Sequence, residues 1–188
     1  ETTTPDDEAR FLAGLPVTHP ELQSLTTEGA WQQHRRVFDE SWKKLEEGQL
    51  ARIRAWTPLT LGNDATSRDP LFYMFSGPDF LYANTFFPSA STYIFCGLEP
   101  VGPVPDVTSL PRGALPGSLG NLRKSLNAVL SFSFFLTKEL KVDLGATRLS
   151  GTLPVLYVFI ARTGNTLKSA ELVSLTDEGE LSAGKGPT

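Results

Sequence analysis

Two short apolar runs near the middle of the chain constrain its fold more than any other feature. Residues 71–75 and 92–96 are rich in aromatic side chains, and small residues, an acid and a proline follow each run. This pattern is typical of a buried strand that ends in a turn. One short helix fits between the runs, before Pro88. A strand, a helix and a second strand at this spacing predict a right-handed parallel crossover.

Upstream of this unit, apolar side chains recur at three- and four-residue steps, which is the spacing of an amphipathic helix. Its predicted apolar stripe comprises Trp31, His34, Phe38, Trp42 and Leu45. Thr27 is the expected N-cap, and a second helix over residues 50–56 should end before Pro58. The tryptophans on this helical face are expected to lie in the core.

Downstream, the sequence predicts a long loop, a long helix and a second pair of strands. Prolines and glycines crowd residues 97–117, which favours an ordered loop. Ser118 is the expected cap of a helix over residues 119–140. The near-continuous apolar run 153–161 predicts a strand covered on both faces, and residues 166–175 should pair with it as a hairpin.

These elements predict an α/β fold in which an N-terminal helical layer packs on a small, Rossmann-like mixed sheet. We expect a disordered acidic tail over residues 1–8, a single domain over residues 9–175, and a flexible tail or severed linker over residues 176–188. The sheet is short, and the strand at 153–161 would leave a costly open edge. We therefore expect a missing C-terminal segment or a homodimer to complete the sheet.

Composition limits the classes of partner and compartment. The chain has 188 residues, of which 40% are hydrophobic, enough for a sizeable core. A net charge of -4 argues against nucleic acid and anionic membrane surfaces as partners. No apolar run approaches the roughly 20 residues that span a bilayer. Because the chain opens at Glu1 without a leader, we expect either a trimmed chain or a mature exported or periplasmic protein.

Few residues could carry catalysis. The histidines, His19 and His34, lie in the helical N-terminal part, away from any serine or cysteine in a hydrolase-like motif. Zinc and iron sites need clustered histidine and cysteine, so we predict no such metal site, while an oxygen-ligand site for calcium or magnesium stays open. Cys96, the single cysteine, is expected to be a small buried apolar residue.

The strand ends of the crossover hold the candidate ligand-binding residues. In open α/β sheets, ligands bind beyond the carboxyl ends of the strands. The residues at those ends are Ser76, Gly77, Asp79, Gly97 and Glu99. The alternative is structural: Asp79 would cap the following helix, and Glu99 would anchor its loop to backbone amides. The sequence thus locates a site without indicating a reaction.

Residues 71–102 resemble the first crossover of class I S-adenosylmethionine methyltransferases, in which a strand enters a glycine-rich turn and a second strand ends near an acid. The resemblance implies a Rossmann-like fold and S-adenosylmethionine as a cofactor, with Asp79 and Glu99 around its nucleoside. The runs Phe-Ser-Gly-Pro-Asp-Phe and Gly-Leu-Glu-Pro-Val-Gly are also similar to uncharacterised bacterial exported proteins, which implies no activity.

Two functional hypotheses follow. The first is a non-catalytic binding or interaction module, as part of a larger exported protein, because catalytic constellations are missing while the long proline-rich loop and the short sheet favour docking. The alternative is a methyltransferase-like enzyme or a nucleoside-binding protein that uses the strand-end acids. A small-molecule ligand is compatible with both.

Overall fold

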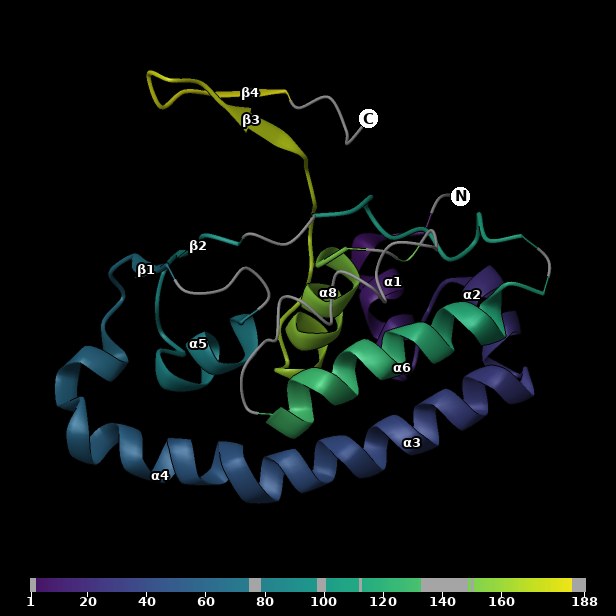
Figure 1. The fold of residues 1–188 in the computed structure, drawn as a ribbon, viewed down its shortest axis with the longest axis horizontal. Coiled ribbons are helices and arrows are strands. Elements are labelled where there is room, and N and C mark those ends of the chain that lie inside the picture. Colours follow the sequence, from purple (N-terminus) through teal and green to yellow (C-terminus); the bar gives the residue numbers. More distant parts are fainter. Residues whose placement is uncertain are drawn as a thin grey trace.

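The computed structural model describes residues 3–74, 79–97, 101–111, 113–132, 149 and 151–183. Within these ranges the chain mixes α and β structure, as predicted, with helices far outnumbering strands (Figure 1). The four described strands form two separate two-stranded sheets instead of the one mixed sheet expected. Helices therefore supply most of the framework.

The elements follow one another along the chain, with η1 a π-helical turn and η2 a 3₁₀-helix. They are α1 (Pro5–Leu12), α2 (Pro20–Thr26), α3 (Gly29–Leu45), η1 (Glu46–Leu50), α4 (Ala51–Thr60), η2 (Gly62–Thr66), β1 (Leu71–Tyr73), α5 (Phe80–Phe86), β2 (Tyr93–Phe95), α6 (Leu115–Phe132), α8 (Leu153–Arg162), β3 (Val173–Leu175) and β4 (Leu181–Ala183).

The core is built around helix α8, which lies beside α1 in the middle of the molecule (Figure 1). Most α8 side chains are buried, including Tyr157 and Phe159, and they meet Phe11 and Leu12 of α1 in one apolar cluster. Helices α3 and α6 pack against each other on one side of this pair, and α5 contacts α8 on another. A helix that is apolar nearly all round is typical of such a central position.

The strand predicted over residues 153–161 is wrong, because this segment is helix α8. Pro154 lies in the first turn, where its missing N–H costs no hydrogen bond and its fixed φ favours a helix. Thr152 and Leu153 donate their backbone N–H groups to the carbonyl of Val101. A short apolar run cannot distinguish a buried strand from a buried helix by its periodicity.

The N-terminal amphipathic helix is confirmed as α3, whose five predicted stripe residues are all buried, but its N-cap is Glu28 and not the predicted Thr27. Helices α3 and α4 form one long, bent rod with the π-helical turn η1 between them (Figure 1). The second helix was predicted to end before Pro58, but α4 contains Pro58 and continues to Thr60. The helix therefore tolerates this proline near its exposed C-terminal end.

The tail predicted over residues 1–8 is wrong from Pro5 onward, because these residues open helix α1. Three consecutive acids in its first turn each accept a backbone N–H from a distant segment. Asp6 accepts from Leu167 at 3.0 Å, Asp7 from Thr18 at 2.8 Å, and Glu8 from Val107 at 3.0 Å. Acidic side chains also favour a helix N-terminus.

Arg162, in the last turn of α8, ties three helices together. Its Nε donates to the carbonyl of Ala13 after α1 at 2.8 Å, and its Nη2 donates to Asp39 of α3 at 2.6 Å. Its guanidinium also lies over the ring of Phe38, 4.8 Å from the centroid. A planar cation suits this combination of stacking and directed hydrogen bonds.

The central crossover is confirmed: β1 and β2 are parallel, and α5 connects them. Phe72 pairs with Ile94 in the register. Aromatic side chains from the inner face pack edge-on against α5, since the Phe80 ring lies 5.3 Å from that of Tyr93 and 6.4 Å from that of Phe95. The two strands thus bury one face of their sheet on the helix between them.

The C-terminal part departs from the predicted hairpin between residues 153–161 and 166–175. Strand β3 pairs antiparallel with β4, which lies inside the tail predicted over residues 176–188. This hairpin stands apart from the helical body (Figure 1). The missing segment or homodimer was inferred from a short sheet and from a strand at 153–161 that is in fact a helix. The prediction has lost the second of these grounds and stays untested.

The long helix after the proline-rich loop is confirmed in part. It begins at Leu115 as α6, so Ser118 is a buried residue of its first turns and not its cap. The predicted continuation over residues 133–140 lies outside the described residues.

The proline-rich loop before α6 passes very close to Gly151, which lies just before α8. A Cβ on Gly151 would meet the backbone of Gly102, and the φ of Gly151 is +86°. This contact requires glycine.

We predict that Asp7→Ala lowers the free energy of unfolding by about 2–4 kcal/mol, because the backbone N–H and the hydroxyl of Thr18 lose the acceptor that the buried Asp7 carboxylate provides. Urea denaturation followed by circular dichroism measures this change. Glu40→Ala removes an exposed acid from α3 and should change the value by less than about 0.5 kcal/mol. Equal effects of the two substitutions would contradict the assignment of Asp7 as an anchor.

Candidate functional site

Asp79 is the predicted strand-end residue whose surroundings are best defined. It occupies the N-cap position of α5, but its side chain makes no capping hydrogen bond. Oδ2 instead accepts a 2.7 Å hydrogen bond from the hydroxyl of Tyr73 on β1. The side chain is buried, and Oδ1 has no hydrogen-bond partner. Asp79 is thus an acceptor held by the fold with one oxygen unused.

Burial raises the pKa of Asp79 to about 6, although the hydrogen bond from Tyr73 opposes this shift. Burial, and then the hydrogen bond to Asp79, raise the pKa of Tyr73 well above its ordinary value. Tyr73 therefore keeps its proton at neutral pH and donates it in the hydrogen bond to the Asp79 carboxylate. The carboxyl group itself changes charge close to neutrality.

The other predicted site residues are only partly accounted for. Gly97 is exposed just beyond the end of β2. Ser76, Gly77 and Glu99 lie outside the described residues. Because β1 and β2 are parallel, Asp79 and Gly97 both follow strands that end at the same edge of the sheet. Ligand binding by these residues stays a prediction.

A second polar contact leads from α5 toward the helical rod. The Tyr82 hydroxyl donates to Oε1 of Gln49 at 3.2 Å, and burial raises the pKa of Tyr82 to about 12. Tyr82 lies one turn after Asp79 on α5, so both side chains belong to the same end of this helix. The contact joins the crossover to the junction of η1 and α4.

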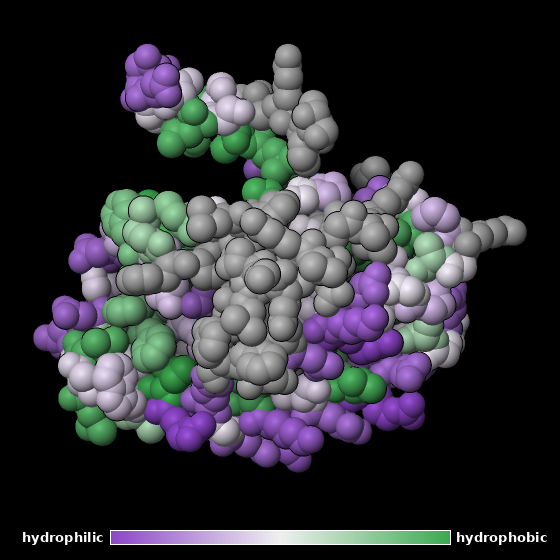
Figure 2. Space-filling model, viewed as in Figure 1, coloured by the Kyte–Doolittle hydropathy of each residue, from purple (hydrophilic) through white to green (hydrophobic). Residues whose placement is uncertain are grey.

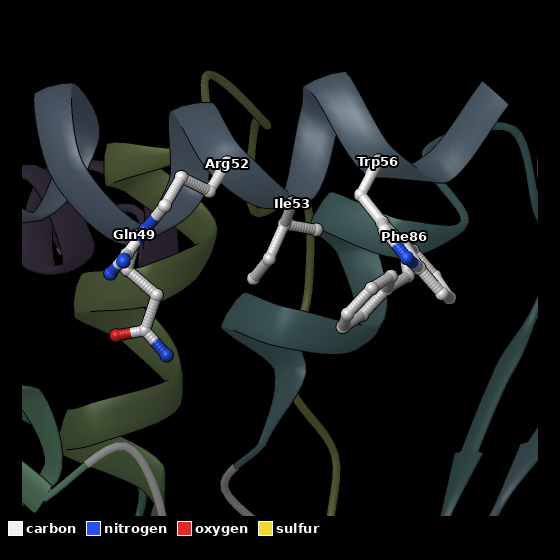
Figure 3. A pocket seen from close by; sticks show the side chains of 5 residues that line it. All are labelled: Gln49, Arg52, Ile53, Trp56 and Phe86. Carbon is white, nitrogen blue, oxygen red and sulfur yellow. The ribbon is translucent and has the colours of Figure 1, made fainter. Parts of the chain in front are cut away.

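A groove of about 420 Å³ opens beside this contact, between α4 and α5 (Figure 3). The residues that line it are Gln49, Arg52, Ile53, Trp56 and Phe86. At one end Trp56 meets Phe86 edge-on, with their ring centroids 6.0 Å apart. Trp56 is 49% exposed, so the prediction that this tryptophan lies in the core is wrong. The Trp56 ring contacts α5 through Phe86 and is otherwise largely open to solvent.

Polar groups gather at the other end of the groove, where Figure 3 shows the side chains of Arg52 and Gln49 close together. The same two residues line a neighbouring hollow of about 320 Å³, which Lys44 and Asn127 also border. The groove has the volume of a small-molecule site and combines an apolar wall with a polar end. It is, however, open to solvent along its length.

The outer face of β1–β2, defined as Phe72, Met74, Ile94 and Cys96, is an exposed apolar surface of the crossover. Phe72 is 66% exposed and Met74 is 55% exposed. Cys96 is exposed too, with its Sγ 3.6 Å from the Sδ of Met74, so the prediction of a buried cysteine is wrong. Both strands turn every second side chain toward solvent, and these side chains are apolar.

The β3–β4 hairpin has an exposed apolar face of its own, defined as Val173, Leu175 and Leu181. The register pairs Leu175 with Leu181, which places these side chains on one side of the hairpin, while Ser174 and Ser182 point to the other. Figure 2 shows apolar residues gathered along the side of the hairpin that faces the body. Two strand pairs therefore leave apolar faces uncovered.

The histidines do not contribute to these surfaces. His34 is fully buried, and its Nε2 donates to the carbonyl of Leu12 at 2.7 Å. Burial lowers the pKa of His34 to about 4, so the ring is neutral at physiological pH. In the described part of the chain, no helix is long and apolar enough to cross a membrane, and no three potential metal ligands cluster.

Sequence reasoning missed Tyr73 and Tyr82 as neighbours of Asp79, and Gln49 as the hydrogen-bond partner of Tyr82. The alternation of β1 could have located Tyr73, because residues 71 and 73 share the inner face of the strand. Tyr82 follows Asp79 by three residues, which is a neighbouring position on a helix. Gln49 offered no signal, since only the tertiary fold brings η1 to α5.

Comparison with known protein families, with curated proteins and with solved structures finds no match to this chain. Functional inference therefore depends on the geometry described above.

We predict that Asp79→Asn removes a pH-dependent loss of stability. The folded carboxyl group, with a pKa near 6, binds its proton more tightly than in the unfolded chain. The stability of the wild-type protein should therefore fall, relative to the variant, as the pH rises from about 4 to about 7, by at most about 3 kcal/mol. Thermal unfolding across this range measures it. A difference between the two proteins that does not change with pH would contradict the burial of this carboxyl group.

Proposed function

We propose that this protein is a non-catalytic interaction module that binds an apolar, strand-forming segment of another polypeptide on the outer face of β1–β2. The observation that carries the proposal is the exposure of Phe72, Met74 and Ile94 on a two-stranded parallel sheet. Parallel sheets are ordinarily covered on both faces. Here α5 covers one face, and the other meets solvent.

The chemistry of this surface favours a polypeptide partner. The strand residues 71–74 and 93–96 contain no charged side chain. Burying apolar area contributes about 25 cal/mol per Å², so covering Phe72 and Met74 would supply a useful part of a binding free energy. Among the described residues, β1 and β2 pair only with each other. The outer edge of each strand therefore keeps backbone groups with which an added strand can pair.

The surroundings of Asp79 also support binding in place of catalysis. Its described hydrogen-bond partner is Tyr73, whose raised pKa keeps it protonated. A nucleophile needs an adjacent base within hydrogen-bond reach, and no serine or cysteine hydroxyl or thiol in the described residues contacts Asp79. The pair serves to hold β1 against α5.

Selection from a displayed library of short peptides tests the proposal. We expect binders with alternating apolar residues, and the double substitution Phe72→Thr with Ile94→Thr should weaken them by at least about tenfold because it removes the central apolar contacts. Threonine preserves strand propensity. Leu59→Gln, which alters an exposed leucine of α4, is the matched control and should leave binding unchanged. Peptides that bind the double variant as tightly as the wild type would exclude this surface.

A second candidate is a nucleoside-binding protein with a Rossmann-like crossover. The parallel β1–α5–β2 unit and the unused Oδ1 of Asp79 support it, since ribose hydroxyls are donors for such an acid. S-Adenosylmethionine, S-adenosylhomocysteine and NAD are the probes. A ligand present at 100 times its dissociation constant should stabilise the protein by about 2.7 kcal/mol, and Asp79→Asn should reduce the effect. The absence of a thermal shift with all three would exclude this candidate.

A further inference from the structure

The β3–β4 hairpin presents an apolar face that the described part of its own chain leaves uncovered. Leu175 is 70% exposed and Leu181 is 72% exposed, and Val173 shares their side of the hairpin. An isolated two-stranded hairpin is at best marginally stable in water, so a hairpin with an apolar face needs a surface to cover it.

The attachment of the hairpin keeps it away from its own body. Leu167 donates its N–H to Asp6, and both Leu167 and Ala170 pack against the apolar core. Only Glu171 and Leu172 separate this anchored segment from Val173. Figures 1 and 2 show the hairpin held outside the helical body, with open space beneath much of it. So short a connection restricts the surfaces of its own chain that it can reach.

Charge distinguishes between the apolar surfaces that could cover the hairpin. Residues 171–183 contain four acids, Glu171, Asp177, Glu178 and Glu180, and no basic residue. Two such hairpins repel each other, which opposes hairpin-to-hairpin association. The strand residues of the outer face of β1–β2 carry no charge, so this face offers apolar contact without repulsion.

From these observations we propose that the hairpin of a second copy of this chain docks on the outer face of β1–β2. The proposal rests on the proposed function and names one partner segment for it. The two surfaces match in size, because each consists of two paired strands of three residues. If each copy gives its hairpin and receives the other, the interface has two-fold symmetry and contains the contact twice. Short hinges favour exchange of this kind between identical chains.

Disulfide trapping tests the arrangement, because Cys96 is the single cysteine of the chain and lies on the receiving face. Val173→Cys, Leu175→Cys and Leu181→Cys place a second thiol on the apolar side of the hairpin. Ser174→Cys and Ser182→Cys, on the opposite side, are the matched controls. Under mild oxidation we expect at least one apolar-side variant to form disulfide-linked dimers, with twice the 20.5 kDa mass of one chain, faster than both controls.

Each other result overturns the proposal. An internal disulfide within one chain would show that the hairpin closes on its own sheet. Equal cross-linking of all five variants would indicate random collision, and no cross-linking would show that the hairpin does not reach this face. A readout without cross-links is sedimentation of the wild type and of Leu175→Ser with Leu181→Ser. The double variant should dimerise at least about tenfold more weakly, and unchanged sedimentation would contradict the proposal.

The outcomes separate this inference from the proposed function. If peptides bind the outer face of β1–β2 but the hairpin variants neither cross-link nor change sedimentation, the interaction module stands and its partner is another protein. If the hairpin docks as proposed, Leu175→Ser with Leu181→Ser should also expose the face and strengthen peptide binding.

Discussion

The fold depends on the first turn of helix α1, where three neighbouring acids hold three segments that are far apart in the sequence. Asp6, Asp7 and Glu8 accept backbone N–H groups from Leu167, Thr18 and Val107. Burial alone would raise the pKa of Asp7, but the hydrogen bonds from Thr18 and Thr4 lower it, so this carboxylate stays charged. Burial raises the pKa of Glu8. These acidic side chains thus position chain segments that precede and follow α8 in the sequence.

Helices α1, α3 and α8 supply most of the core. The strands therefore do not form the central layer of the core, as they do in most α/β proteins. Trp31, Phe38 and Phe159 pack within the helical layers, and Arg162 connects them through Ala13 and Asp39. The β1–β2 pair contributes one aromatic face to this body, and β3–β4 stands beyond it. The apolar side chains that the strands turn to solvent are therefore available for a partner.

The sequence predicted the elements whose polarity pattern contrasts with their surroundings. Helix α3 has a clear apolar stripe, and β1 and β2 are short aromatic runs bounded by prolines and small residues. Helix α8 was mistaken for a strand because its less buried stripe, Leu153, Leu156 and Ile160, is apolar too, and without polar residues a helical period is invisible. Pro154 was the overlooked signal, as prolines also open α1 and α2.

The sequence predicted where Asp79 lies better than it predicted the surroundings of this residue, and ligand binding there stays a prediction. Asp79 was located from the order of strand, turn and helix, which depends only on local sequence. Its hydrogen bond to Tyr73 and the groove beside Trp56 required tertiary packing that no local pattern encodes. Cys96 was expected in the core because it lies within an apolar run, and Trp56 because it continues the apolar spacing of a helix. Burial, however, depends on whether another element covers that face. Exposed apolar residues look identical to core residues in a sequence.

The central claim is that the helical core is stable without a partner, whereas the two strand pairs become stable only when a partner covers their exposed apolar faces. Native-state hydrogen exchange at several protein concentrations tests it most directly. We predict slow exchange in α1, α3 and α8 at every concentration, with exchange in β1, β2, β3 and β4 that is fast in dilute protein and slows as the concentration rises. Strand amides that exchange as slowly as those of α8 in the most dilute sample would contradict the account.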